Sequence, residues 1–353
     1  MPLACIIDVA GTRLTADEKA FFRAADPWAF ILFARSCESP GQMRALTGEM
    51  REAVGREALI FIDQEGGRVQ RLKPPVWPQF PVVSTYGRMW ETDRAAAREA
   101  TFLHHRLIAH ELRAVGVDAD CAPCLDLRIE GASSVIGDRA FSTDPDVIAE
   151  LGRAAMDGLH AGGVASVIKH MPGHGRALLD SHHHLPTVVE GLQALEQDLR
   201  PFKALADAPM GMTAHIVYDA FDDPTPTTMS ARVIEEIIRG RIGFDGLLMT
   251  DDISMKALTG TSQAKGAGAL AAGCDVAMLC NAPLEERLAF AAACKPLAGR
   301  SLERALAAEA VARAPLAPFD VEAAWARFEA LTGTGRGSQI AVSLDPTEQR
   351  GTV

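Results

Sequence analysis

The chain has 353 residues, 48% hydrophobic and 23% charged, so it can bury a sizeable core and is not globally disordered. Lysine and arginine total 35 against 46 aspartates and glutamates, which gives a formal net charge of −11. An acidic chain without basic runs argues against nucleic-acid binding and against attachment to an anionic membrane, although a few local cations can still hold an anionic substrate. The length fits two ordinary domains or one α/β barrel.

The chain also lacks the marks of a membrane or secreted protein. No apolar run approaches the ~18 residues of a membrane-spanning helix, and the opening MPLACIIDVAG predicts a buried strand rather than a secretion signal. The seven cysteines are scattered, and Cys121-Ala-Pro-Cys124 has no second pair or nearby histidine to complete a zinc site. We interpret the cysteines as core thiols in a reducing compartment and predict a cytoplasmic protein.

Short apolar runs alternate with longer helical patterns along the chain. Near-continuous hydrophobicity in the short runs is typical of strands buried on both faces of a parallel sheet. The predicted strands are Cys5–Val9, Ala29–Phe33, Leu59–Asp63, Val115–Ala119, Ser166–Lys169, Gly211–Ala214, Leu247–Asp251 and Val276–Cys280. Eight strands, each followed by a helix or long loop, favour a closed (β/α)8 barrel over an open doubly wound sheet, and no Gly-x-Gly-x-x-Gly follows the first strand.

Helix boundaries support this alternation. Thr15-Ala-Asp-Glu18 predicts a capping box, and Ser39 followed by Pro40 predicts a second helix start. Further N-caps are predicted at Asp144 and Ser230, and left-handed C-terminal positions at Gly163 and Gly273. Arg300–Leu331 predicts two more amphipathic helices packed on the outside. We therefore assign 1–331 to one catalytic barrel domain and 332–353, which has no periodicity, to a flexible C-terminal tail.

Polar residues cluster at the predicted carboxyl ends of the strands, where a barrel carries its active site. The third strand runs into the segment from Asp63 to Arg71, and the fifth ends in Lys169-His-Met-Pro-Gly-His-Gly175 followed by Asp180-Ser-His182. The sixth ends in His215 and the seventh in Thr250-Asp-Asp252. Such polar groups on the ends of apolar strands predict a catalytic cleft.

Position alone suggests roles for some of these residues. Asp251 follows the apolar Leu247–Met249 and should be held rigidly at the barrel mouth, so we predict a reacting carboxylate there, whereas Asp252 is interpreted as a helix N-cap. Gly173 and Gly175 predict sharp turns in the loop after the fifth strand.

Other chemistry remains open at this point. The consecutive His182–His184 can be a solvated loop or metal ligands, but three successive side chains cannot all point at one ion, so no metal site is predicted. Lys169 at a strand end can form a Schiff base, as barrel aldolases do.

Five segments resemble the glycoside hydrolase family 3 β-N-acetylglucosaminidases, the single-domain type of peptidoglycan recycling. They are IDQEGGRVQR (Ile62–Arg71), APCLDL (Ala122–Leu127), IGDRAF (Ile136–Phe141), KHMPGHG with DSHHHLP (Lys169–Pro186) and GFDGLLMTDDISM (Gly243–Met255). They occur in the family's order over roughly residues 3–300, and the histidine loop separates this subgroup from the family's β-glucosidases. Met171 replaces the usual phenylalanine and Thr250 the usual serine, and neither touches a reacting group.

The resemblance implies the following roles. Asp251 corresponds to the nucleophile, His182 to the general acid/base and Asp180 to its partner. The residues that correspond to binding of the terminal N-acetylglucosamine are Asp63, Arg71, Arg139, Lys169 and His170. The family uses no metal or organic cofactor.

Physical chemistry agrees with these assignments. Retaining glycoside hydrolysis requires a carboxylate beneath the anomeric carbon and a proton donor beside the leaving oxygen. A histidine titrates near neutrality, so His182 can donate and then accept a proton in one turnover, and Asp180 can orient its ring.

We therefore predict a cytoplasmic, monomeric exo-β-N-acetylglucosaminidase that acts with retention on a small-molecule saccharide. It would remove terminal GlcNAc from GlcNAc-(anhydro)MurNAc and its peptides in cell-wall recycling, which links it to cell-wall biogenesis, cell shape and division. The alternatives are a β-glucosidase-like enzyme, a hexosaminidase of chitin oligomers, a Lys169 Schiff-base aldolase and a sugar-binding barrel without activity. An intact set of Asp251, Asp180 and His182 argues against the last.

Overall fold

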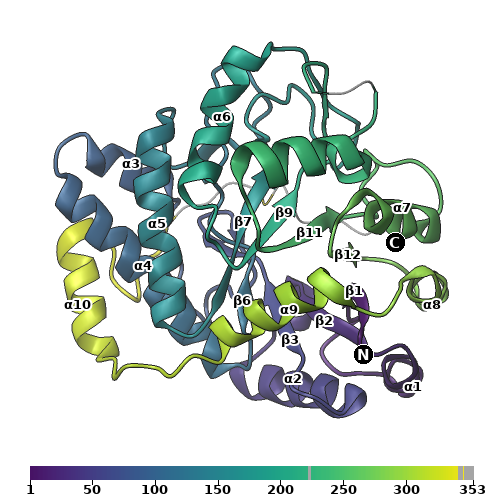
Figure 1. The fold of residues 1–353 in the computed structure, drawn as a ribbon. Coiled ribbons are helices and arrows are strands. Elements are labelled where there is room, and N and C mark those ends of the chain that lie inside the picture. The colour runs from purple at the N-terminus through teal and green to yellow at the C-terminus, as the bar shows by residue number, and fades with distance from the viewer. Residues whose placement is uncertain (222–223, 341–344, 346–353) are drawn as a thin grey trace.

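The protein is represented by a computed structural model, which describes residues 1–221, 224–340 and 345. The described residues form a closed barrel of eight parallel strands surrounded by helices (Figure 1). The order around the barrel is β1-β12-β11-β9-β7-β6-β3-β2, so each barrel strand pairs with its neighbour in sequence and the first meets the last. The predicted (β/α)8 barrel is confirmed.

All eight predicted strands overlap a barrel strand. The barrel strands are β1 (Leu3–Asp8), β2 (Pro27–Leu32), β3 (Leu59–Ile62), β6 (Ala119–Asp120), β7 (Ala165–Met171), β9 (Met210–Thr213), β11 (Leu247–Asp252) and β12 (Val276–Leu279). The fourth predicted range was mostly wrong. Val115 is the C-cap of the preceding helix and Gly116 turns the chain at φ +83°, so the buried valines that imitated a strand belong to a helix end.

Helices cover the outside of the barrel. They are α1 (Ala16–Ala25), α2 (Pro40–Val54), α3 (Ser84–Trp90), α4 (Arg94–Ala114), α5 (Pro145–Ala161), α6 (Leu192–Ala204), the π-type helix η4 (Val233–Ile242), α7 (Ser262–Ala272), α8 (Leu284–Ala293) and α10 (Val321–Thr332), while α9 (Gly299–Ala312) lies at one end of the barrel. Three single 3-10 turns, η1 (Ala34–Ser36), η2 (Gly137–Arg139) and η3 (Thr227–Met229), lie in loops. Small two-stranded sheets form from β4 (Gln64–Gly66) with β5 (Val69–Gln70), and from β8 (Thr187–Val188) with β10 (Val217–Tyr218).

The predicted caps explain where several helices begin. The hydroxyl of Thr15 accepts the amide of Glu18, whose carboxylate accepts the amide of Thr15 in return, which is the predicted capping box. Ser39, Asp144 and Ser230 likewise accept amides of the first turns that follow them. Gly163 and Gly273 adopt the left-handed conformation, at φ +70° and +115°.

Helix α9 closes one end of the barrel instead of packing on its outside, which corrects the sequence prediction. Its alanines Ala305, Ala308 and Ala312 are buried in the same hydrophobic cluster as the barrel interior, together with strand-start residues such as Leu59 and Leu247. Small side chains allow the helix to approach the strands closely, and it crosses the barrel in Figure 1. The amino ends of the strands are therefore sealed, and the carboxyl ends remain available for a site.

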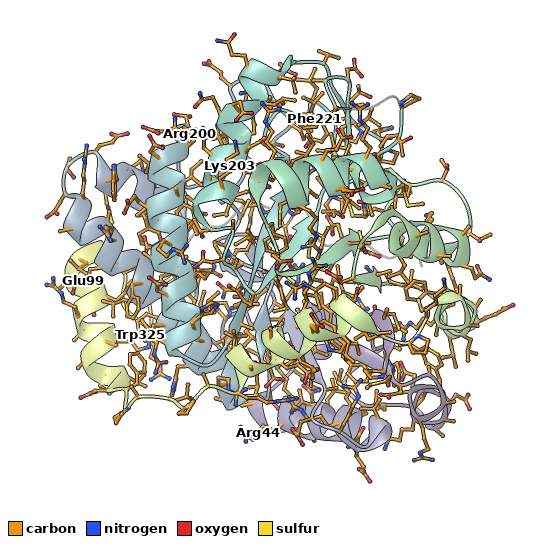
Figure 2. The ribbon with its side chains drawn as sticks, in the orientation of Figure 1. Arg44, Glu99, Arg200, Lys203, Phe221 and Trp325 are labelled. Atoms are coloured by element: carbon orange, nitrogen blue, oxygen red, sulfur yellow. The ribbon has the colours of Figure 1, made fainter. Side chains whose placement is uncertain are left out.

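Helix α10 packs on the outside of α4, as predicted. Arg327 of α10 pairs with both carboxylate oxygens of Glu99 at 2.6 Å, and Trp325 stacks on Phe80 with ring centroids 5.4 Å apart (Figure 2). Most of the predicted tail, 341–344 and 346–353, lies outside the described residues. Within the described part of the chain, no helix is both long enough and apolar enough to span a membrane.

Candidate active site

One pocket at the carboxyl ends of the strands gathers nearly all the predicted site residues. Those that line it are Asp63, Arg71, Arg139, Lys169, His170, His182 and Asp251. The eighth, Asp180, contacts His182. Residues from five separate segments between positions 63 and 251 thus converge as the barrel topology requires.

The hairpin β4–β5 brings Asp63 and Arg71 together. Gly66 and Gly67 have φ of +93° and +60°, and a Cβ on Gly67 would lie 2.4 Å from a methyl carbon of Val82, so the tight turn and its packing both require glycine. The side-chain oxygen of Gln64 accepts the amide of Arg71 at 2.8 Å and fixes the return strand. As a result, Arg71 Nη2 lies 2.9 Å from Asp63 Oδ2.

Charged side chains of alternating sign form a connected group beside the pocket. Lys169 Nζ lies 2.9 Å from Asp63 Oδ1 and 2.7 Å from Glu65 Oε1. Glu65 in turn receives two hydrogen bonds from Arg139, at 2.8 and 2.9 Å. The buried charges are thereby paired, which is what their removal from water requires.

This pairing sets the protonation states. Burial alone would raise the pKa of Asp63, but the charges of Lys169 and Arg71 outweigh it and hold that pKa well below its usual range. Burial would lower the pKa of Lys169, but Asp63 and Glu65 reverse the effect and raise it. The lysine is therefore a cation that orients hydrogen-bond acceptors, and it is poorly suited to the neutral amine that Schiff-base formation needs.

A second buried carboxylate, Asp126, holds the segment after β7. Its Oδ2 lies 2.7 Å from His170 Nδ1, and its Oδ1 accepts the amide of His174 at 2.6 Å. Burial would raise the pKa of Asp126, but the neighbouring His170 lowers it. Asp126 thus fixes the ring of His170 and the path of the following loop.

The loop that carries Asp180 and His182 packs tightly on its neighbours. A Cβ on Gly175 would lie 2.1 Å from the carbonyl oxygen of Leu127, and Gly173 has φ +139°, which confirms the predicted turns. Farther along, the hydroxyl of Ser181 lies 3.0 Å from His174 Nε2. These contacts hold the segment that leads to His182.

Asp180 and His182 form a hydrogen-bonded dyad. His182 Nδ1 lies 2.7 Å from Asp180 Oδ1, which also accepts the amide of His182 at 2.9 Å. Burial opposes a charged imidazole, but the hydrogen bond to Asp180 and the negative charge of Asp251 outweigh it and raise the pKa of His182. The same pairing lowers the pKa of Asp180 to about 2 against the opposing effect of burial. With Nδ1 held by the carboxylate, Nε2 is available for proton exchange.

The adjacent Asp251 and Asp252 occupy different environments. Burial would raise the pKa of Asp251, but the nearby His170, His215 and His182 lower it, so the carboxylate is ionised. Burial raises the pKa of Asp252 to about 7 even though Ser254 and Cys280 hydrogen-bond to it. Asp252 is not the predicted helix N-cap, because α7 is capped by Thr261; it accepts the Ser254 amide at 2.9 Å and closes a turn.

The other histidines of the predicted cluster divide into two groups. His183 and His184 are exposed beside the dyad. His215 is fully buried, with Nδ1 2.7 Å from the Thr228 hydroxyl and Nε2 3.1 Å from the Asp252 carbonyl oxygen. His215 therefore supports the strand end below Asp251.

Cys124, Asp126 and His170 are the group in the described residues whose ligand atoms lie close enough together to hold a metal ion. The oxygens of Asp126 already accept two amides, the Cys124 thiol at 3.3 Å and His170 Nδ1. The ligand atoms of this group are thus already engaged in hydrogen bonds within the protein.

All seven cysteines are free and six are buried, which confirms the interpretation as core thiols.

Sequence reasoning assigned no role to three carboxylates of this region. Glu65 lies in the IDQEGGRVQR motif and Asp126 in the APCLDL motif, and both motifs follow strand ends. Their position could therefore have indicated that both carboxylates lie near the site. Asp345 also reaches the site, where it pairs with Arg71, yet it comes from a segment without periodicity. Nothing in the local sequence indicated that contact.

A barrel with an ionised carboxylate and a His–Asp dyad at one pocket fits the class of barrel glycoside hydrolases. Residues 10–314 match the model of the glycosyl hydrolase family 3 N-terminal domain. The chain is 41% identical over 299 residues to a beta-hexosaminidase of Bordetella avium (strain 197N), a match that covers 82% of this chain and 85% of that protein.

Solved structures agree. NagZ from Neisseria gonorrhoeae in complex with N-trifluoroacetyl-D-glucosamine matches with a TM-score of 0.83 at 31% identity, over 94% of this chain and 98% of that chain. The same protein in complex with zinc ion matches with a TM-score of 0.82 at 30% identity and the same coverage. The chain therefore belongs to glycosyl hydrolase family 3, and its relatives place it among the family's β-N-acetylhexosaminidases, which confirms the family and the activity that the sequence resemblance implied.

Proposed function

We propose that the protein is a retaining exo-β-N-acetylglucosaminidase that removes terminal GlcNAc from GlcNAc-(anhydro)MurNAc and its peptides in cytoplasmic cell-wall recycling. The observation that carries the proposal is the meeting of Asp251 and the Asp180–His182 dyad in one pocket with the cations and carboxylates that suit a sugar. The complex of the N. gonorrhoeae relative with an N-acylated glucosamine supports the choice of sugar.

In the first step Asp251 attacks the anomeric carbon of the bound sugar. The glycosidic bond breaks as the glycosyl–Asp251 ester forms, and protonated His182 gives its proton to the departing oxygen. A lowered pKa at Asp251 and a raised pKa at His182 favour the two protonation states that this step needs. Asp180 stabilises the imidazolium before the transfer and keeps its ring oriented.

In the second step His182, now neutral, accepts a proton from water. The resulting hydroxide attacks the anomeric carbon, the ester bond to Asp251 breaks, and the sugar leaves with its original configuration. One histidine can serve in both directions because the ordinary pKa of an imidazole lies near neutrality, whereas a carboxyl acid would need burial to reach that range.

The charged wall of the pocket, which consists of Asp63, Lys169, Arg71, Arg139 and His170, is proposed to bind the sugar; it is called the sugar-binding wall below. Asp63 and Lys169 present a carboxylate and an ammonium 2.9 Å apart, which suits a hydroxyl that both donates and accepts. Arg71, Arg139 and His170 add donors along the same pocket. Because buried polar groups lose their partners when a substrate lacks the matching group, such a wall discriminates strongly between sugars.

Family membership leaves a β-glucosidase-like enzyme or a chitin-oligomer hexosaminidase as alternatives. The deciding experiment compares hydrolysis of 4-nitrophenyl β-N-acetylglucosaminide with that of the β-glucoside. We expect a higher kcat/KM for the acetamido sugar, and a clear preference for the glucoside would overturn the assignment. GlcNAc-anhydroMurNAc against chitobiose then separates the two acetamido substrates. Sodium borohydride with a carbonyl substrate should trap no adduct on Lys169.

A further inference from the structure

Asp345 places a carboxylate against Arg71 at the charged side of the pocket. Asp345 forms an ion pair with Arg71 Nη1, and the two side chains are 3% and 1% exposed. The partners are 274 positions apart in sequence. An ion pair this deeply buried differs from the exposed pairs of the surface helices, which contribute little to stability or function.

Arg71 is held between two carboxylates. Its Nη2 lies 2.9 Å from Asp63 Oδ2, while Nη1 faces Asp345. Its guanidinium carbon also lies over the ring of Phe33, 5.4 Å from the centroid, and both residues line the pocket. Burial would lower the pKa of Arg71, but the charges of Asp63 and Asp345 outweigh this effect and raise it.

Asp345 belongs to a continuous row of charges. The row runs Asp345, Arg71, Asp63, Lys169, Glu65, Arg139, with alternating signs and direct contacts throughout. Without Asp345, Arg71 would lose one of its carboxylate partners and would draw more fully on Asp63. A carboxylate that is more engaged internally accepts hydrogen bonds from a sugar less well.

We propose that Asp345 is a positioning residue for the sugar-binding wall: it holds one terminal nitrogen of Arg71, so that Asp63 stays available to the sugar and affinity depends on the C-terminal segment. The proposal rests on the proposed function in one respect, since it takes Asp63 and Arg71 to contact the bound sugar. The chemistry of catalysis at Asp251 and His182 is not altered.

The test measures kcat and KM for 4-nitrophenyl β-N-acetylglucosaminide, Ki for free N-acetylglucosamine, and Tm in Asp345→Asn and Asp345→Glu. Asp345→Asn should raise KM and Ki about tenfold, the low end of what one hydrogen bond to a charged group contributes, and should leave kcat within about threefold. Asp345→Glu should recover part of the affinity. Glu322→Gln is the matched control, because it removes an exposed carboxylate of α10 that pairs with Arg336.

A double-mutant cycle with Arg71→Lys distinguishes positioning from a structural role. If Asp345 acts through Arg71, Asp345→Asn should raise KM little further in the Arg71→Lys background, whereas independent effects would multiply. A chain that ends at Ile340 should reproduce the rise in KM. The proposal is overturned if Asp345→Asn lowers Tm while KM and Ki stay unchanged, or if kcat falls alone.

The failure of the proposed function would look different. In that case the wild-type chain would prefer the β-glucoside, and the same variants would be measured with that substrate and with free glucose as inhibitor. Asp63 and Arg71 would face the hydroxyls of either sugar, so the expected rise in KM and Ki stays the same. An unchanged KM with the preferred glycoside would overturn the role of Asp345 whichever sugar is preferred.

Discussion

Asp251 and Asp252 are adjacent in the chain, but they contact different groups in the fold. Histidines surround Asp251 and favour its ionised form, whereas Asp252 is committed to Ser254 and to the amide of Cys280. A nucleophile must be ionised, and burial disfavours that form of Asp252 by raising its pKa to about 7. The environment therefore distinguishes two side chains that are chemically identical.

The first prediction uses this pair. Asp251→Ala should lower kcat on the order of 10⁴-fold or more because the nucleophile is lost, and the fold should survive. Asp252→Ala should retain measurable activity. Mass spectrometry after reaction with a slow 5-fluoro-glycosyl substrate should find the adduct on Asp251. An adduct on Asp252 would contradict the assignment.

The second prediction concerns His182 as the proton donor. General acid catalysis contributes roughly 10²–10⁴-fold when the leaving group is poor. His182→Ala should therefore lose about that much on a disaccharide, yet form the glycosyl-enzyme from a dinitrophenyl glycoside with far less impairment. Azide should accelerate breakdown of that intermediate, since azide needs no general base. His183→Ala is the control and should be nearly silent, because His183 is exposed. Equal slowing of both substrates without azide rescue would exclude this role.

The third prediction is a pH shift in Asp180→Asn. The protonated form of His182 is the working acid, so kcat/KM should fall as pH rises through the pKa of His182, which lies above its ordinary value. Replacing Asp180 removes a hydrogen bond that raises this pKa. The alkaline limb of the profile should therefore move to lower pH, while His183→Ala leaves it in place. An unmoved limb in Asp180→Asn would show that the dyad does not set the proton donor's pKa.

At the level of elements, periodicity and caps predicted most of the barrel, and the exceptions have physical reasons. Capping residues act through contacts within one turn, so the helix starts at Thr15 and Ser39 could be predicted from the neighbouring residues alone. Val115 and Val117 looked like a strand because burial beneath helices produces the same apolar run. The position of α9 could not be predicted, because small residues on a helix do not indicate which surface they pack against. The alanines of α9 fit the end of the barrel as well as its outside.

The fourth prediction tests α9 as the plug of the barrel. Ala308 is completely buried against the barrel interior. Ala308→Leu should overpack this end and destabilise the protein by about 1–3 kcal/mol, seen as a lower Tm. Ala307→Leu makes the same change on an exposed position of the same helix and should leave Tm nearly unchanged. Activity at low temperature should persist in both variants, because the pocket lies at the opposite end. Equal Tm values in Ala308→Leu and Ala307→Leu would contradict the role of α9 as the plug of the barrel.

For the whole molecule, motif and strand position together predicted which residues converge, while their roles stay predictions. Seven of the eight predicted residues line one pocket, because the carboxyl ends of parallel barrel strands meet wherever those strands fall in sequence. Glu65 and Asp126 had no assigned role because their partners, Arg139 and His170, stand 74 and 44 positions away. The contact of Asp345 with Arg71 could not be predicted for the same reason, because an ion pair across 274 positions depends on the complete fold.

The last prediction is that the intact protein needs no metal ion. Asp126, the centre of the group whose geometry suits a metal, already has both carboxylate oxygens engaged by amides, His170 and Cys124. A metal there would have to displace the hydrogen bond that orients His170. Prolonged dialysis against a chelator should therefore leave both activity and Tm unchanged, whereas a structural or catalytic ion would change at least one of them. Zinc is added back as a separate arm, because the N. gonorrhoeae relative has been solved with zinc ion. A loss on chelation that zinc restores would contradict the prediction, while inhibition by added zinc would not.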